Sequence, residues 1–266
     1  MSELPGVYKA MKKNGEMYYR SSVTYKNKHI SLGSSPFMSI AGQIYATAVD
    51  LLYDKSRGIE DYPPDCCLPF EKWVILVNLR DNGIYFKNPI YLRNRYFIYY
   101  INRKILLKFD VDDLFYYANH RITKRGGYLF VSDYGMQTNI LSRYGIKNFA
   151  VPDRDYRFVN GDESDYRYGN IEILNRYYGV VMKIHKGRPV YTAKIHINGD
   201  YIIGRYHSEN EAAIAYNKAI RVLRDKGISI SFHENYINDI NEIEYARIFH
   251  QVRISKKIRE FQPVKK

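Results

Sequence analysis

The sequence predicts an α+β protein in which two small modules, each of three antiparallel strands and one helix, flank a different α+β domain. Two observations carry this prediction. An internal repeat relates the two ends of the 266-residue chain, and within each copy the apolar pattern changes from strict alternation to a helical spacing. We expect a module at 1–58, a linker at 59–69, a middle domain at 70–176, a second module at 177–230, and a helix with a basic tail at 231–266.

The repeat is defined by fixed offsets from a glycine that ends the third expected strand. Counting onward from Gly33 and from Gly204, both copies place Ala at +8, Tyr at +12 and Ala at +15. These residues are Ala41, Tyr45 and Ala48 in the first copy and Ala212, Tyr216 and Ala219 in the second. Chance explains so many shared offsets poorly, so both ends are expected to have one fold.

The strands are clearest in the second copy. Tyr191, Ala193, Ile195 and Ile197 alternate with Thr192, Lys194 and His196, which is the period of a half-buried strand. Asn198-Gly199 is next along the chain and is a hairpin signal, because both residues tolerate positive φ. In the first copy, Lys26-Asn27-Lys28 occupies the corresponding turn.

A helix is expected after each of these sheets. In the second copy it should begin at Ser208 as N-cap, with Glu211 completing a capping box, and run to about Lys226. Its face of small alanine side chains can lie close to a sheet.

The middle and the connecting segments give weaker signals. Trp73–Val77 and Tyr96–Ile101 are apolar enough to be buried strands. Three prolines, at 63, 64 and 69, favour an extended connector. Residues 236–250 predict a further helix. The basic tail beyond it, which adds phosphate contacts or is a frayed end, contains Lys256, Lys257, Arg259, Lys265 and Lys266.

Composition narrows the class of protein. The formal charge of +13 favours a polyanionic partner through counterion release. No apolar stretch approaches the ~20 residues that span a bilayer, and the N-terminus lacks a signal-peptide core, so we expect no membrane partner. The adjacent Cys66 and Cys67 suit neither a disulfide framework nor structural zinc, which favours a reducing intracellular, cytoplasmic and nucleoid-associated location.

The repeated motif resembles the DNA-binding domain of plant ethylene-response factors (ERF-like), which is similar to domains in phage and bacterial homing endonucleases and integrases. The resemblance is carried by Gly6-Val7-Tyr8, the strand ends Leu32-Gly33 and Ile203-Gly204, and the alanine-rich helices. It covers about residues 4–55 and 177–228. It implies a sheet that enters the major groove and contacts bases through the face opposite the helix. Most of the family's Arg and Trp contacts are absent here, and only Arg20 remains on the corresponding strand.

Strand alternation nominates DNA contacts independently. If Val23 and Tyr25 face the helix, then the outward residues are Arg20, Ser22 and Thr24 in the first copy and Thr192, Lys194 and His196 in the second. Phosphate contacts are expected from the cations near the first strand, its turn and the next turn, namely Lys9, Lys12, Lys13, Lys26, Lys183, Lys186 and Arg188. The alternative interpretation is a solvated charged face.

The middle segment resembles the His-Asn-His (HNH) homing endonucleases, which implies a ββα-metal-like α+β domain. Asn160, Gly161, Asp165, Arg167 and Asn170 match its strand–turn–helix scaffold. Its catalytic positions instead hold Ser142, Arg157 and Phe158. Phe158 cannot accept a proton and Arg157 would repel a cation, so we expect no catalytic residue, no metal and no cofactor.

The preferred hypothesis is therefore a sequence-preferring double-stranded DNA-binding protein, a transcription regulator or architectural factor, that uses both modules on one duplex. Arg143, Arg157 and Arg167 would add backbone contacts from the pseudo-nuclease core. That core is alternatively a spacer or a dimerisation unit of a homo-oligomer. The other hypotheses are a nicking endonuclease with a relocated base at His120 beside Asp153 and Asp155, and a protein-interaction module.

Overall fold

The computed structural model describes residues 4–133, 135–148, 150–228 and 231–262, and it confirms a mixed α+β protein built from several small three-stranded antiparallel sheets. The chain forms two compact units. One comprises residues 1–140 and 160–170, and the other comprises residues 141–159 and 171–266. Within the described residues, no helix is both long and apolar enough to cross a membrane.

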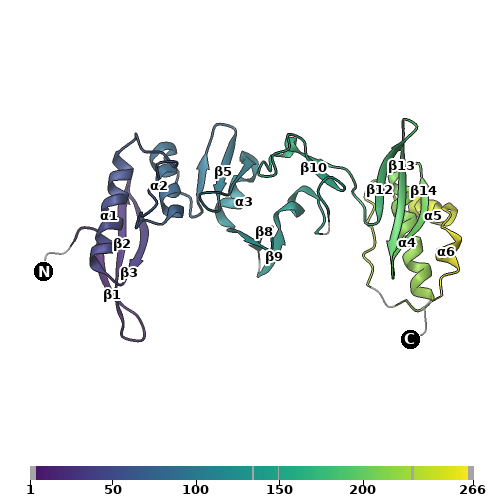
Figure 1. The fold of residues 1–266 in the computed structure, drawn as a ribbon, viewed down its shortest axis with the longest axis horizontal. Coiled ribbons are helices and arrows are strands. Elements are labelled where there is room, and N and C mark those ends of the chain that lie inside the picture. The colour runs from purple at the N-terminus through teal and green to yellow at the C-terminus, as the bar shows by residue number, and fades with distance from the viewer. Residues whose placement is uncertain (1–3, 134, 149, 229–230, 263–266) are drawn as a thin grey trace. The chain divides into compact units, whose positions relative to one another are not determined.

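The N-terminal sheet has the strand order β1-β2-β3, with one helix, α1, packed against it (Figure 1). The elements are β1 (Val7–Met11), β2 (Met17–Tyr25), β3 (Lys28–Ser35) and α1 (Met38–Tyr53). Lys26 and Asn27, both at positive φ (46° and 60°), form the two-residue turn between β2 and β3. Ile30 and Leu32 face α1 and are buried, so the expected module is present.

Ser22, predicted as an outward DNA contact, is buried beside a β-bulge. The pairing of β2 with β3 shifts register between Ser21 and Ser22, and Ser22 is only 8% exposed. Simple alternation placed Ser22 on the outward face with Arg20 and Thr24. The residue left unpaired by this shift is Leu32 of β3. Ser22 is covered by its neighbours, and its side chain is not available to a groove.

The residues predicted as an extended linker, 59–69, pack into a hydrophobic core. The residues predicted as a buried strand, Trp73–Val77, belong to a helix, α2 (Phe70–Asn82). Trp73 to Arg80 are all buried, so the helix shows no polar face in the sequence. Ile59 and Leu68 of the expected linker are buried in the same core as α1 and α2. The Trp73 indole donates to the Gly58 carbonyl at 3.0 Å. The first module therefore shares its core with the expected linker and with α2.

The rest of this unit is two more three-stranded sheets around an aromatic core. The elements are β4 (Ile90–Leu92), β5 (Tyr96–Tyr100), β6 (Leu106–Asp110), the 3-10 helix η1 (Val111–Asp113), α3 (Leu114–Asn119), β7 (Ile122–Arg125), β8 (Tyr128–Asp133) and β9 (Met136–Asn139). The strand expected at 96–101 is thus confirmed as β5. Phe109 stacks against Phe97 and Tyr166 and lies 4.3 Å, centroid to centroid, from Tyr117.

The second unit begins with a short 3-10 helix and a two-stranded ribbon. These are η2 (Ile140–Tyr144), whose first residue still belongs to the first unit, β10 (Tyr156–Phe158) and its antiparallel partner β11 (Ile171–Ile173). The nuclease resemblance implied a helix after Asp165. The chain forms only a one-turn 3-10 helix there, η3 (Tyr168–Asn170), before it enters β11, and that expectation is wrong.

The C-terminal sheet, ordered β12-β13-β14, repeats the first module (Figure 1, green to yellow). Its elements are β12 (Val180–His185), β13 (Arg188–His196), β14 (Asp200–Tyr206), α4 (Glu209–Asp225), α5 (Glu242–Gln251) and α6 (Lys256–Arg259). The Asn198-Gly199 hairpin is present, with three residues between His196 and Asp200. Ser208 occupies the N-cap position of α4 as expected, but its side chain makes no capping hydrogen bond, so the capping box is not formed.

The segment after α4 packs against it. The helix expected at 236–250 begins later, at Glu242, where the Asn241 side chain accepts from the Glu244 N–H. Ile254 and Ile258 are buried in the core of the C-terminal module. The tail is therefore not frayed as far as it is described, and Lys265 and Lys266 lie outside the described residues.

Candidate nucleic-acid interface

Each module contains the same backbone contact, which the spacing of the repeated residues in the sequence did not show. The Ser22 N–H donates to the Gly6 carbonyl at 2.9 Å, and the Lys194 N–H donates to the Gly179 carbonyl at 2.7 Å. Both glycines have a φ of +67°.

At both glycines a β-carbon would overlap a tyrosine ring and a backbone carbonyl. At Gly6 it would lie 2.1 Å from the Tyr45 ring and 2.6 Å from the Ser22 carbonyl. At Gly179 it would lie 2.3 Å from both the Tyr216 ring and the Lys194 carbonyl. Each module thus fixes β1 or β12 against the bulge and the helix tyrosine in the same way. The repeat is therefore structural, and it makes Ser22 the counterpart of Lys194 and Arg20 the counterpart of Thr192.

On the N-terminal sheet, Arg20 lies exposed on the face opposite α1. It stands across from Tyr8 on β1 and Ser34 on β3. Its Nη2 and Nε atoms donate to the Tyr18 hydroxyl at 2.7 and 3.1 Å. A neutral partner holds the guanidinium without neutralising its charge, so it remains able to bind an anion or a base edge.

The other predicted residues of this module are spread over several surfaces. Thr24 is exposed on the outward face, with its Oγ1 3.4 Å from His29 Nδ1. Lys9 is exposed but stands across from Tyr19, on the opposite side of the sheet from Arg20. Lys12 forms an ion pair with Glu16 at 2.8 Å beside the first turn, and Lys26 occupies the second turn. Only Arg20 and Thr24 therefore share the predicted face.

On the C-terminal sheet, the predicted outward residues do share one face. Lys194 and His196 are exposed on β13, opposite Ile202 and Asp200. His196 Nδ1 lies 2.9 Å from the Asp200 carboxylate. Thr192 is half-buried between Val181 and Arg205. Lys183 belongs to the same side of β12, while Lys186 and Arg188 lie in and after the β12–β13 turn.

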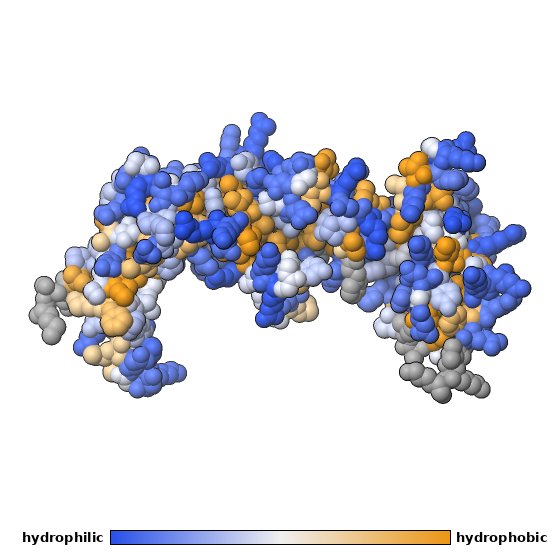
Figure 2. Space-filling model, viewed as in Figure 1, coloured by the Kyte–Doolittle hydropathy of each residue, from blue (hydrophilic) through white to orange (hydrophobic). Residues whose placement is uncertain are grey.

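Arg205 on β14 is an outward cation that was not among the residues predicted from the sequence. It is exposed beside Thr192. Alternation from the buried Ile203 would place Arg205 on the inward face, and the register shift at Ala193 and Lys194, which leaves Ile203 unpaired, removed that signal. On the face drawn in Figure 2, hydrophilic side chains surround smaller apolar patches over the C-terminal module.

Two of the three arginines predicted from the middle segment, Arg157 and Arg167, form ion pairs. Arg157 Nε donates to Glu172 at 2.6 Å across the β10–β11 ribbon. Arg167 forms a two-point ion pair with Asp165. Arg143 is exposed in η2. Ion pairing lowers the net positive charge that Arg157 and Arg167 could offer to a phosphate.

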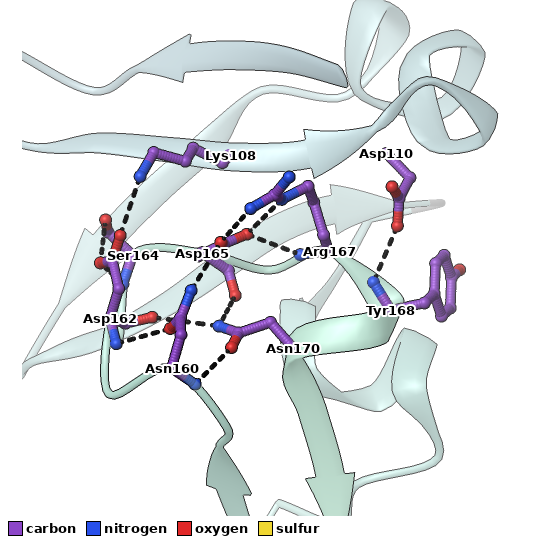
Figure 3. Close-up of polar contacts among 9 residues, drawn as sticks. All are labelled: Lys108, Asp110, Asn160, Asp162, Ser164, Asp165, Arg167, Tyr168 and Asn170. Carbon is purple, nitrogen blue, oxygen red and sulfur yellow. Dashed lines mark hydrogen bonds and ion pairs between the residues drawn. The ribbon is translucent and has the colours of Figure 1, made fainter. Parts of the chain in front are cut away.

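The loop that carries the nuclease-like residues is a closed polar network (Figure 3). Asp165 is fully buried and accepts from Asn160 Nδ2 at 3.0 Å as well as from Arg167. Asn170 accepts from the Asn160 N–H at 2.8 Å and donates to the Asp165 carbonyl at 2.8 Å. Lys108 on β6 binds Asp162 at 2.9 Å, and Asp110 accepts from the Tyr168 N–H.

The carboxyl groups of this loop are held in their ionised form. Hydrogen bonds from Ser164 and Lys108 lower the pKa of Asp162 to about 2. Burial raises the pKa of Asp165, but hydrogen bonds from Arg167 and Asn160 outweigh it and lower that pKa. The matched residues thus serve the loop itself, which explains their presence without a metal.

The residues considered as a relocated catalytic site have other bonds. His120 Nδ1 lies 2.8 Å from the Tyr116 carbonyl, and its ring stacks on the Tyr116 ring. Asp155 accepts from Arg154 and from the Val151 N–H. Asp153 has a φ of +62° in the turn before β10. Among the described residues, no three His, Cys, Asp or Glu side chains are grouped so that they could hold a metal ion.

Comparison with known proteins returns no match for this chain, whether against protein-family models, curated proteins or solved structures.

Proposed function

We propose that this protein binds double-stranded DNA through the outward faces of its two three-stranded sheets. The observation that carries the proposal is the structural repeat: two modules with the same glycine–tyrosine contact each present one exposed cation on the central strand, at different positions of the repeat, Arg20 and Lys194. A three-stranded sheet is narrow enough to enter the major groove, where Arg reads guanine and Lys contacts bases or phosphates. The net charge of +13 supports the same partner.

The test is a double substitution, Arg20→Ala with Lys194→Ala, in the full-length chain. The control is Arg95→Ala with Lys104→Ala, which removes the same charge from exposed residues of the β4–β6 sheet region. A base or phosphate contact is worth about 1–3 kcal/mol. Two contacts total about 2–6 kcal/mol, so we expect the first pair to weaken duplex binding ~30-fold or more and the control to change it little. Equal affinities of the two double variants would refute the proposal.

We further propose that binding occurs without strand cleavage. The proposal rests on Arg157 and Phe158 at the positions that an HNH nuclease uses for its metal ligand and base, with Arg157 already paired to Glu172. Incubation of supercoiled plasmid with the protein and Mg²⁺ or Mn²⁺ tests this. Plasmid that stays supercoiled supports a binding protein, while nicking that His120→Ala abolishes would establish the nicking endonuclease with a relocated base.

A further inference from the structure

The second unit contains a pocket of about 520 Å³ beside the C-terminal sheet. One wall is the outward side of β12 and β13, including Val181 and Lys194. The facing wall comes from residues 145–147, Ala150, Arg154 and Asp155, and from Ile173, Asn175, Tyr177 and Tyr178. The volume falls within the range of about 300–1,000 Å³ that small-molecule sites occupy. The pocket adjoins the face proposed to meet DNA, because Lys183, Lys194 and His196 belong to both.

The charges in this pocket are unbalanced. The cationic side chains that line it are Lys147, Arg154, Lys183, Lys194 and, when protonated, His196. Of the two lining carboxylates, Asp155 is paired with Arg154 at 2.6 Å, and Asp200 lies 2.9 Å from His196 and is also acted on by the charge of Lys194. Among the described residues, no carboxylate lies within ion-pair distance of Lys147, Lys183 or Lys194. Three ammonium groups therefore border one concavity without an ion pair, and Asp200 is the one lining carboxylate, among the described residues, that is left to balance them.

Lys147 is the most informative of the three. Its ammonium lies 3.7 Å from the centroid of the Tyr178 ring and donates to Asn235 Oδ1 at 3.2 Å. Burial lowers the pKa of Lys147 to about 8, while the more distant Glu209, which is bonded to Arg176, acts in the opposite direction. A desolvated cation with only neutral partners is costly unless an anion joins it. This position thus favours an anionic ligand.

The remaining lining is apolar and aromatic. The accessible part of it comes from Tyr178, Ile173 and Val181, while the lining residues Ile146, Tyr177, Val180, Ile195 and Tyr216 are largely buried beneath it. A ligand with an anionic group joined to a flat, largely apolar ring system would match the cationic and the apolar lining of the pocket. Aromatic side chains are common partners of nucleic-acid bases. We propose that the pocket binds one nucleotide, with its phosphate among the three lysines and its base against the apolar wall.

Two sources would supply this ligand: an unpaired nucleotide of the bound duplex, or a free nucleoside monophosphate. The first rests on the proposed function, and the second does not. The probes are therefore the four deoxynucleoside 5′-monophosphates and a pair of duplexes, one fully paired and one with a single bulged nucleotide. The variants are Lys147→Met and Lys183→Met, the second being exposed and remote from the core, with Lys104→Met as the charge-matched control.

If the pocket takes a nucleotide of the duplex, the wild type should prefer the bulged duplex at least 10-fold, and both pocket variants should lose that preference while Lys104→Met keeps it. If it takes a free nucleotide, calorimetric titration should show binding of a monophosphate that both pocket variants weaken at least 10-fold. Saturation should also raise the pKa of Lys147, measured by NMR. A wild type with neither property, or pocket variants that match Lys104→Met, would overturn the proposal. Failure of every duplex to bind would reject only the DNA-binding function, because the monophosphate titration still decides the pocket.

Discussion

Arg80 is the residue on which the N-terminal core most depends. Its guanidinium is buried, and Nη1 donates to the carbonyls of Leu51, Asp54 and Arg57 at 3.0, 2.6 and 2.8 Å. The first two carbonyls lie at the end of α1, where the last turn leaves acceptors unsatisfied and favours positive charge. Asp81 binds the other side of the guanidinium. Arg80 therefore joins α2 to α1.

We expect Arg80→Met to lower the free energy of unfolding by about 3–5 kcal/mol, because it leaves buried carbonyls and a carboxylate without their partner. Urea denaturation measures the change. Arg95→Met, at an exposed position, is the control and should cost little. Similar losses in both variants would show that the Arg80 contacts are not stabilising.

Asp162 predicts how stability responds to acid. Its pKa is lowered to about 2 in the folded protein, from 3.8, by Ser164 and Lys108. A carboxyl group with a lowered folded pKa stabilises the fold above its unfolded pKa, and that contribution is lost as the pH falls from about 4 to about 2. Asp162→Asn should flatten the dependence of unfolding free energy on pH in this window. Asp112→Asn, an exposed carboxyl, should leave it as in the wild type; a flat wild-type profile would contradict the assignment.

At the scale of elements, a glycine before the first strand of each module, Gly6 or Gly179, lets the backbone approach its neighbours closely. Gly179 allows β12 to pass between the Lys194 carbonyl and the Tyr216 ring, while Gly187, also at positive φ (75°), has open space around it. Comparing substitutions at Gly179 and Gly187 therefore distinguishes the cost of a left-handed backbone from the cost of a steric overlap.

We expect Gly187→Ala to cost about 1–2 kcal/mol from the left-handed backbone alone, and Gly179→Ala to cost about 1–3 kcal/mol more through the enforced overlap. Thermal or urea unfolding of both variants provides the comparison. Equal costs would mean that the close approach at Gly179 relaxes freely. Gly6 and Gly15 offer the same comparison in the first module.

At the scale of the whole molecule, the charge of +13 predicts a strong salt dependence of DNA binding. Each phosphate contact contributes about 0.9 to the slope of log affinity against log salt concentration. Arg20→Ala with Lys194→Ala should reduce the slope by up to about 2, and less if either residue contacts bases. Filter binding from low to high salt measures it, and an unchanged slope with unchanged affinity would place the contacts elsewhere. A wild type with a flat salt response would instead favour a protein-interaction module.

The sequence determined the features that depend on neighbours along the chain. The repeat, the strand alternation at Ala193, Ile195 and Ile197, and the exposure of Arg20, Lys194 and His196 result from local periodicity, and all are present in the fold. The mixed α+β architecture with two like modules was predictable from the same patterns.

Only the tertiary structure decided the features that depend on distant packing. Trp73 to Val77 belong to a helix rather than the predicted strand, and burial on every side had erased the 3.6-residue period that would have revealed it. Ser22 is buried where the Gly6 backbone accepts from its N–H, a contact between residues that alternation along β2 does not record. The pocket around Lys147 joins segments that lie far apart in the chain, so no local pattern could encode it. The periodicity of a sequence segment indicates which face of one helix or strand is apolar. Burial and cavities depend instead on how several elements pack together.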